Sequence, residues 1–339
     1  MKKTIIIIGV LFSFNFINAQ DPIFTQYFMI PESINSSFTG AKEGPKAGII
    51  HRTQWPGINF SINTQFAYVD NWFEEMNSGI GISVLNHKET TTRYDFTQVN
   101  LNYALKYQLG EDWFFRPSIS FGYGNKSFGF QDLLLGDQID INNGVIHSTS
   151  IDPILLNEKI NFFDISSSIL INNERSWIGL TLKHLNKPNI SMAYKENNNL
   201  DMFMSLHSSI EFPLNTNFGR MGNEDSLYLL TNFMYQGEYN RFDFGTQYVN
   251  GNFSLGILAA TNPIRKNPNS HFLTSMNAYA GFKYEGFKFG YSYDYTLSDI
   301  ARYSNGSHEV FLELQIRTKK TEDSSIPWLK RNRIYNTGN

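Results

Sequence analysis

The chain has 339 residues, no cysteine and a formal net charge of −3. The absence of cysteine excludes disulfides and thiolate metal sites, and the slight acidic excess argues against a nucleic-acid-binding surface. Aromatic residues make up 15% of the chain and charged residues only 17%, below the ~25% of typical soluble domains. This composition favours a protein that exposes apolar surface to lipid.

The N-terminus has the three parts of a secretory signal peptide. Lys2 and Lys3 precede an apolar run from Ile5 to Phe16, and the small residue Ala19 stands before Gln20. This order is typical of a charged region, an apolar region and a cleavage site. The run is shorter than the roughly 20 residues of a spanning helix, so an uncleaved anchor is the less favoured alternative. We expect export to the cell outer membrane, with cleavage after Ala19.

Apolar and polar residues alternate one by one from residue 95 to 108 and again from 287 to 296. Successive strand side chains point to opposite faces, so each segment is predicted to be a strand with one apolar and one polar face. The apolar face meets lipid in a transmembrane barrel, whereas in a secreted sandwich it meets a core. Fourteen segments are predicted as strands: 46–55, 59–69, 79–87, 95–108, 113–124, 161–171, 176–185, 200–214, 227–238, 241–249, 252–261, 273–284, 287–296 and 308–317.

The connections between these strands alternate in length. Short turns follow strands 4, 6, 10 and 12, at residues 109–112, 172–175, 250–251 and 285–286. Long connections follow strands 5, 7, 11 and 13, at residues 125–160, 186–199, 262–272 and 297–307. Two connections, 215–226 and 239–240, break the pattern. Bacterial barrels have even strand numbers, short periplasmic turns and longer outer loops. The sequence therefore predicts an all-β transmembrane antiparallel barrel of about 14 strands with both termini periplasmic.

The domain organisation follows from these boundaries. We expect a signal peptide (1–19), a periplasmic N-terminal segment (20–45), the β-barrel (46–317) and a basic periplasmic tail (318–339). Phe24, Tyr27 and Phe28 are too apolar for a free end, so we expect them to pack at the periplasmic mouth or against a partner there. The tail is either a solvated end or a short peptide that docks a partner through Trp328, since buried Trp and Arg often carry interface energy.

No arrangement of residues indicates catalysis, a cofactor or a metal centre. The seven histidines stand singly, without zinc-ligand spacing, and the sequence has no P-loop, nucleophile elbow or dinucleotide fingerprint. The longest connection carries oxygen donors that could chelate Ca²⁺, but Val145 stands where an EF-hand requires glycine. We therefore predict no catalytic, cofactor-binding or metal residues, and we keep calcium binding by the outer loops as an open alternative.

Several short motifs are not explained by alternation. They are Asp21-Pro22-Ile23-Phe24-Thr25-Gln26-Tyr27, Arg52-Thr53-Gln54-Trp55-Pro56-Gly57, Gly290-Tyr291-Ser292-Tyr293-Asp294 with Ser298, and Gly306-Ser307-His308-Glu309-Val310. Their order and spacing resemble the PorP/SprF family of Bacteroidetes, outer-membrane proteins of the type IX secretion and gliding machinery. The resemblance runs from Gln20 to Arg317. One departure is the stretch from Ile34 to Gly40, which keeps the family's Asn and Gly but lacks the Pro.

The resemblance implies a non-enzymatic barrel that supports export or surface attachment of a large cargo protein, such as a gliding adhesin, through the cargo's C-terminal domain. Other type IX components in the periplasm and outer membrane are implied as partners, alongside the lipid bilayer. The alternative is a passive porin or small-solute transporter. An open lumen favours the porin, and a lumen plugged by residues 20–45 favours the accessory protein. A third class, an outer-membrane enzyme, requires a clustered nucleophile and base at the outer rim.

The motifs supply candidate partner-binding residues. A structural interpretation competes with that role: Arg52 and Glu309 pair inside the lumen, Asp294 joins the same network, and Trp55 and Tyr293 are interfacial aromatics. The candidates are Asp21, Pro22, Phe24, Gln26, Tyr27, Arg52, Gln54, Trp55, Tyr293, Asp294, Ser298, Gly306, His308 and Glu309.

Overall fold

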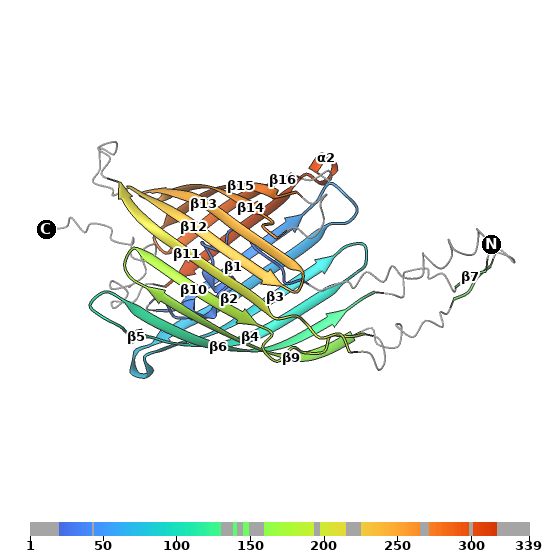
Figure 1. Ribbon diagram of the computed structural model, residues 1–339, viewed down its shortest axis with the longest axis horizontal. Coiled ribbons are helices and arrows are strands. Elements are labelled where there is room, and N and C mark those ends of the chain that lie inside the picture. The colour runs from blue at the N-terminus through green and yellow to red at the C-terminus, as the bar shows by residue number, and fades with distance from the viewer. Residues whose placement is uncertain are drawn as a thin grey trace.

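The computed structural model is a closed, up-and-down antiparallel β-barrel (Figure 1). It describes residues 20–42, 44–129, 138–140, 145–148, 159–192, 197–214, 225–264, 271–297 and 301–316. Each strand of the wall pairs with its neighbours in chain order, and the first and last strands pair with each other from Lys46↔Gln315 to Gln54↔Ser307. The predicted signal peptide and the basic tail lie outside the described residues.

The wall contains the fourteen strands that alternation predicts. β4 and β5 count as one wall strand, because both pair with β6 and only Lys106 separates them. The largest difference in bounds is at the end of β2, which reaches Phe73 rather than residue 69. The strands are β1 (Lys46–Gln54), β2 (Ile62–Phe73), β3 (Ser78–Glu89), β4 (Asp95–Leu105), β5 (Tyr107–Gln108), β6 (Phe114–Ser127), β9 (Lys159–Asn172), β10 (Ser176–Lys183), β11 (Phe203–Leu214), β12 (Asp225–Gln236), β13 (Tyr239–Asn250), β14 (Phe253–Thr261), β15 (Leu273–Tyr284), β16 (Phe287–Thr296) and β17 (Ser307–Gln315).

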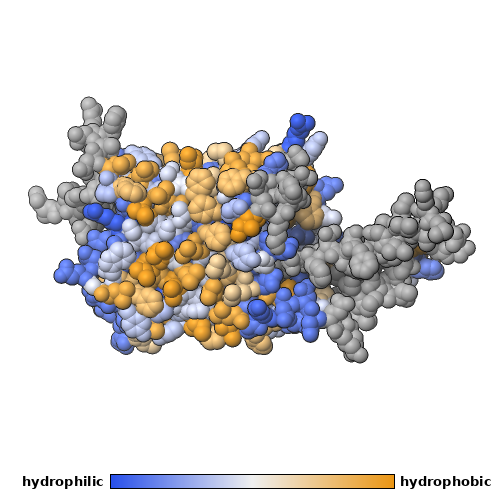
Figure 2. All heavy atoms as spheres, in the orientation of Figure 1, coloured by the Kyte–Doolittle hydropathy of each residue, from blue (hydrophilic) through white to orange (hydrophobic). Residues whose placement is uncertain are grey.

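Alternation places the two kinds of side chain as predicted. Leu101 and Tyr103 on the outer face of β4 are 52% and 37% exposed, while Gln98 and Asn102 on its inner face are 6% and 9% exposed. The outer surface carries apolar side chains across its middle, with hydrophilic residues toward the two ends (Figure 2). This distribution matches a bilayer, whose apolar interior lies between two polar interfaces. Among the described residues, no helix is long and apolar enough to cross a membrane.

The two ends of the barrel differ in their connections. The end with residues 74–77, 109–113, 173–175, 215–224, 251–252 and 285–286 is called the short-turn end. The opposite end, called the long-loop end, has residues 55–61, 90–94, 128–158, 184–202, 237–238, 262–272 and 297–306. The predicted parity is confirmed with its two exceptions, at 215–224 and 237–238. A small hairpin of β7 (Ile139–Asp140) and β8 (Val145–Ile146) lies within the longest loop, and α2 (Ala301–Ser304) precedes β17.

Residues 20–42, hereafter the plug, lie inside the barrel. The sequence predicts this segment at the periplasmic mouth, and the structure instead places it along the lumen. Asp21 and Ile316 therefore lie at opposite ends of the barrel, so the prediction that both termini lie on the periplasmic side is not confirmed. The plug starts at the long-loop end, where Asp21 contacts residues at the ends of β10 and β12, and it descends to the start of β1 at the short-turn end. Two short 3-10 helices, η1 (Pro31–Ser33) and η2 (Ser36–Phe38), lie in the second half of the plug. The physical reason is the hydrophobic effect: inside the lumen the apolar side chains of the plug are removed from water, whereas at a solvated mouth they would stay exposed to it.

Candidate functional site

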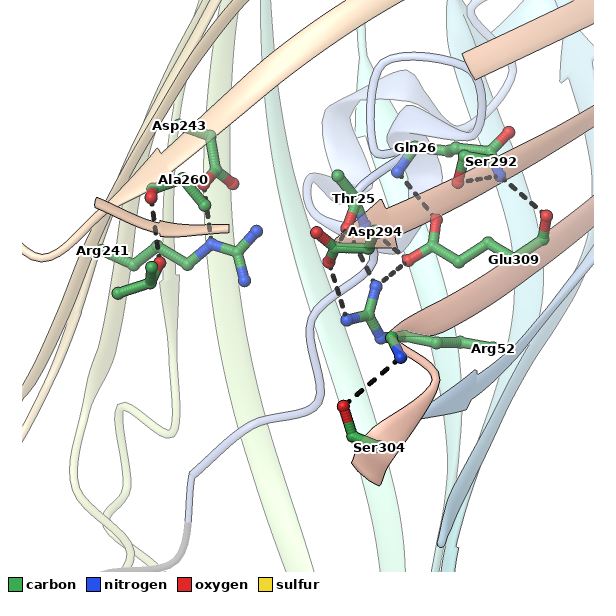
Figure 3. Close-up of polar contacts among 12 residues, drawn as sticks. Thr25, Gln26, Arg52, Arg241, Asp243, Ala260, Ser292, Asp294, Ser304 and Glu309 are labelled. Carbon is green, nitrogen blue, oxygen red and sulfur yellow. Dashed lines mark hydrogen bonds and ion pairs between the residues drawn. The ribbon is translucent and has the colours of Figure 1, made fainter. Parts of the chain in front are cut away.

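The plug is held at a cluster of buried charges on the seam between β1 and β17 (Figure 3). Arg52 and Glu309 are register partners across this seam, and both point inward. The guanidinium of Arg52 forms an ion pair with the Glu309 carboxylate, and its Nη2 lies 3.1 Å from Asp294 Oδ2. The ion pairs expected between these three residues are therefore present. Each charge has a partner, as buried charges require.

The same carboxylate binds the plug backbone. The N–H groups of Thr25 and Gln26 donate to Glu309 Oε1 and Oε2 at 2.8 and 3.0 Å. The Gln26 amide donates to Ser292 Oγ at 2.9 Å, and Arg52 Nη1 donates to Thr25 Oγ1 at 2.9 Å. All four motifs of the sequence thus meet at one place. Their geometry shows a docking site for the protein's own N-terminal segment.

A second polar contact holds the start of the plug at the long-loop end. Asp21 Oδ1 lies 2.8 Å from His184 Nε2, and His184 Nδ1 lies 3.0 Å from Asp164 Oδ1. Gln236 donates to Asp21 at 3.3 Å, and Lys183 Nζ lies 3.6 Å from its other oxygen. Burial disfavours both charges, but their mutual attraction outweighs it: the pKa of His184 rises to about 9, and the pKa of Asp21 falls below its ordinary value. At neutral pH the contact is an ion pair.

Aromatic packing adds to these polar contacts. Phe24, Tyr27 and Phe28 are 4%, 1% and 4% exposed and belong to one buried apolar cluster in the lumen. Phe28 meets Tyr279 edge-on, with ring centroids 5.4 Å apart, and Phe24 packs 6.4 Å from Phe66. Fully burying such a side chain contributes roughly 1.5–3 kcal/mol. Phe24 and Tyr27 therefore anchor the segment, but in the lumen rather than at its mouth.

The second half of the plug contacts charged wall residues that the sequence motifs did not indicate. Lys42 Nζ lies 3.1 Å from Glu313 Oε1, and Lys288 lies 3.0 Å from the same oxygen. Arg116 donates to the carbonyl oxygens of Ser37 and Thr39 at 3.1 and 3.3 Å. Glu313, Lys288 and Arg116 occupy inward positions on strands whose residues alternate between the inner and the outer face. Charged residues at lumen-facing positions of the predicted strands are therefore the sequence signal for these contacts.

A close backbone contact seats the plug at the short-turn end. Gly79 of β3 lies against Thr39 and Gly40, so that a Cβ at Gly79 would stand 2.1 Å from the Thr39 carbonyl oxygen. Gly40 has φ +61°, a conformation that favours glycine. The Gly that the sequence keeps without its preceding Pro thus has a physical role in the plug.

The remaining candidates fall into separate groups. Gln54 and Trp55 line a cavity at the long-loop end, together with Arg52 and Asp294. Trp55 has φ +57° and donates its N–H to the Gly306 carbonyl oxygen at 2.9 Å, which joins the loops after β1 and before β17.

Tyr293 and His308 lie on the outer face, with ring centroids 5.1 Å apart, as interfacial aromatics would. Pro22 belongs to the plug and lines a cavity between the plug and the barrel wall. Ser298 lies outside the described residues.

The described residues contain no group of three or more His, Cys, Asp or Glu side chains placed to hold a metal ion. The oxygen donors of the longest loop that suggested Ca²⁺ have side chains outside the part of the chain that the structure describes.

Comparison with known proteins places the chain in a family. A family model described as type IX secretion system membrane protein PorP/SprF matches residues 16–314. The chain belongs to the PorP/SprF family. It is therefore an outer-membrane barrel related to type IX secretion. The resemblance drawn from the motifs is confirmed. No curated protein sequence matches the chain.

Among solved structures, the chain is similar to the outer membrane protein Omp33 of Acinetobacter baumannii, with 7% identity and a TM-score of 0.40, covering 82% of this chain and 100% of that one. It is also similar to the CymD monoaromatic hydrocarbon channel, with 13% identity and a TM-score of 0.45, covering 89% and 95%. A mutant of the TodX monoaromatic hydrocarbon channel matches at 8% identity and a TM-score of 0.44, covering 83% and 90%. These similarities are too distant to bear on function.

Proposed function

We propose that this barrel is a non-enzymatic accessory of type IX secretion that supports export or surface attachment of a large cargo protein. The observation that carries the proposal is the plugged lumen. Passive diffusion requires a water-filled channel, whereas residues 20–42 occupy the barrel interior from one end to the other. The family supplies the secretion system in which a plugged barrel acts.

The plug contacts argue against easy opening. Releasing the plug breaks the backbone bonds to Glu309, the Asp21–His184 pair and the Lys42–Glu313 pair. Separating one buried pair costs roughly 3–5 kcal/mol when a charge is left unpaired. A cost of ~3 kcal/mol alone leaves the open state below about 1% of molecules. A barrel whose lumen is closed in nearly all molecules is suited to recognising a partner and poorly suited to passing solutes by diffusion.

We infer that loops at the end of the barrel recognise the cargo. Loops on a rigid scaffold carry variable contacts, and the connections between β6 and β9 and between β16 and β17 are the candidate cargo contacts. Binding there selects a partner by shape and polar complementarity and lowers no chemical barrier. The cargo's C-terminal domain and other type IX components are the proposed partners.

A deletion strain tests the proposal. We expect one or a few large surface proteins to disappear from its surface proteome while bulk type IX export continues. A variant lacking residues 21–28 should assemble in the membrane but fail to restore the lost proteins, and the wild-type gene should restore them. An unchanged surface proteome with a growth defect on one nutrient would instead support a transporter.

A further inference from the structure

The outer surface of β15 and β16 carries a wide apolar belt. Five successive outward positions on each of the two strands are apolar or aromatic: Met276, Ala278, Ala280, Phe282 and Tyr284 on β15, and Phe287, Phe289, Tyr291, Tyr293 and Tyr295 on β16. Outward positions recur about every 6.6 Å along a strand, and barrel strands tilt by roughly 40°. Five positions therefore span about 25 Å of bilayer, which is the usual height of the apolar band.

The belt on β1, β2 and β3 is only about half as high. Its outward apolar runs have two or three residues: Ala47 and Ile49 on β1, Ala67 and Val69 on β2, and Ile80, Ile82 and Val84 on β3. Toward the long-loop end, the runs stop at His51, Gln65 and Asn86, which are neighbours in register. Toward the short-turn end, Asn71 interrupts the run on β2, and the exposed Glu75 follows in the turn. Tilting the whole barrel would move this belt along the membrane normal but would not widen it.

The polar side chains above the narrow belt bond one another across the strands. Thr53 Oγ1 donates to Asn63 Oδ1 at 3.0 Å. Asn86 Nδ2 donates to Asp95 Oδ1 at 2.9 Å and to Thr97 Oγ1 at 2.7 Å. These bonds hold the side chains on the outer face, where hydrocarbon would offer no partner to their remaining polar atoms. Headgroups or water must therefore reach this depth.

A bilayer accommodates a short apolar stretch by becoming thinner beside it. We propose that the outer membrane is locally thinned beside β1, β2 and β3. The partner of this face is lipid rather than a second protein, because its polar side chains are already bonded to one another along the strands. The thinned lipid borders the seam of β1 and β17, where an inserting polypeptide would cross less hydrocarbon than beside β15 and β16.

Single-cysteine labelling in pure lipid tests this proposal, because the chain has no cysteine of its own. Gln65→Cys and Asn71→Cys place a fluorophore at the two edges of the narrow belt on β2. Phe289→Cys and Tyr295→Cys on β16 are the matched controls, since they also face outward and are also six residues apart. Each variant of the mature chain is folded into dioleoyl phosphatidylcholine vesicles, with and without lipid brominated along its acyl chains, and gel mobility confirms folding.

We expect bromine to quench both β2 labels severalfold less than both β16 labels, because only the β16 labels lie within hydrocarbon. Quenching at residue 65 or 71 as strong as at residues 289 and 295 would overturn the proposal, since it would show a bilayer of uniform height. Shielding of the β2 labels from both bromine and aqueous iodide would also overturn it, because the face would then be covered by another copy of the barrel.

A second variant widens the belt. Gln65→Leu combined with Asn71→Leu gives β2 five successive outward apolar residues, like β16. We expect its folded fraction, relative to the wild type, to rise roughly twofold or more in dioleoyl vesicles and to change little in the thinner dilauroyl vesicles. Ser208→Leu on β11, between the outward Leu206 and Ile210, is the control and should act alike in both lipids. An equal effect of the double variant in the two lipids would contradict the proposal.

Discussion

At the scale of single residues, the charges of the lumen are explained by the plug. Glu309 accepts two plug N–H groups as well as the Arg52 guanidinium, and Glu313 binds Lys42 of the plug together with Lys288 of the wall. Removing water from a charge is unfavourable unless partners replace it. The wall charges therefore specify where the plug lies, and the plug in turn makes those buried charges tolerable.

The seam pair gives the first prediction. Arg52→Gln leaves Glu309 and Asp294 as buried carboxylates without their cation, so we expect a loss of roughly 3–5 kcal/mol. Unfolding in urea, followed by the gel-mobility shift of barrels, measures this loss. Lys88→Gln is the matched control: its pair with Asp95 is 56% and 37% exposed and should contribute at most about 1 kcal/mol. Equal losses in the two variants would contradict the role of the seam pair.

The pair between Asp21 and His184 gives a pH dependence. The pKa of His184 rises from 6.5 to about 9 in the folded protein, so its contribution is complete below about pH 6.5 and is lost as the pH rises through 9. The pKa of Asp21 falls below 3.8, so its contribution is present above pH 4 and is lost in stronger acid. Stability from this pair should therefore be greatest between about pH 4 and 6.5.

Thermal unfolding at pH 6 and at pH 9.5 measures this effect. We expect the wild type to lose about 1–3 kcal/mol between the two values through this pair, and His184→Gln to lose markedly less. His51→Gln, on the outer face of β1, should keep the wild-type difference. A His184→Gln protein with the full wild-type difference would rule the pair out as its source.

At the scale of elements, the strands could be predicted from sequence and the plug could not. Period-two alternation is a local signal, and it located all fourteen wall strands, including Leu273–Tyr284 and Phe287–Thr296 at their observed bounds. The plug has no periodicity, since only short η1 and η2 interrupt its irregular chain. Its position depends on long-range contacts such as Gln26 with Ser292. The motifs located the docking site, but partner binding by those residues stays a prediction.

The seat of the plug on β3 can be tested by adding one methyl group. Gly79→Ala places a Cβ 2.1 Å from the Thr39 carbonyl oxygen, and such overpacking should destabilise by roughly 1–3 kcal/mol. Gly110→Ala is the control, because its Cβ meets nothing within 4 Å. Urea unfolding compares the two, and protease cleavage of the plug should increase in Gly79→Ala alone. Equal stability and equal cleavage would mean that the plug does not sit tightly on β3.

At the scale of the whole molecule, barrel closure and plug docking are coupled. Arg52 lies on the first strand and Glu309 on the last, so they become neighbours only when β1 pairs with β17. The carboxylate that binds Thr25 and Gln26 therefore gains its cation at the moment of closure. The plug precedes β1 directly, which keeps it beside this seam. We therefore expect closure of the wall and docking of the plug to stabilise each other.

Single introduced cysteines can measure the orientation in the membrane, because the chain has no cysteine of its own. Bacterial barrels keep short turns in the periplasm and long loops outside, so the long-loop end should face the medium. Tyr303→Cys in α2, where the side chain is 67% exposed, should react with an impermeant maleimide on intact cells. Glu111→Cys, exposed in the 109–113 turn, should react only after the outer membrane is permeabilised. Permeabilised cells control for thiol reactivity. The reverse pattern would place the start of the plug in the periplasm and remove the proposed cargo loops from the surface.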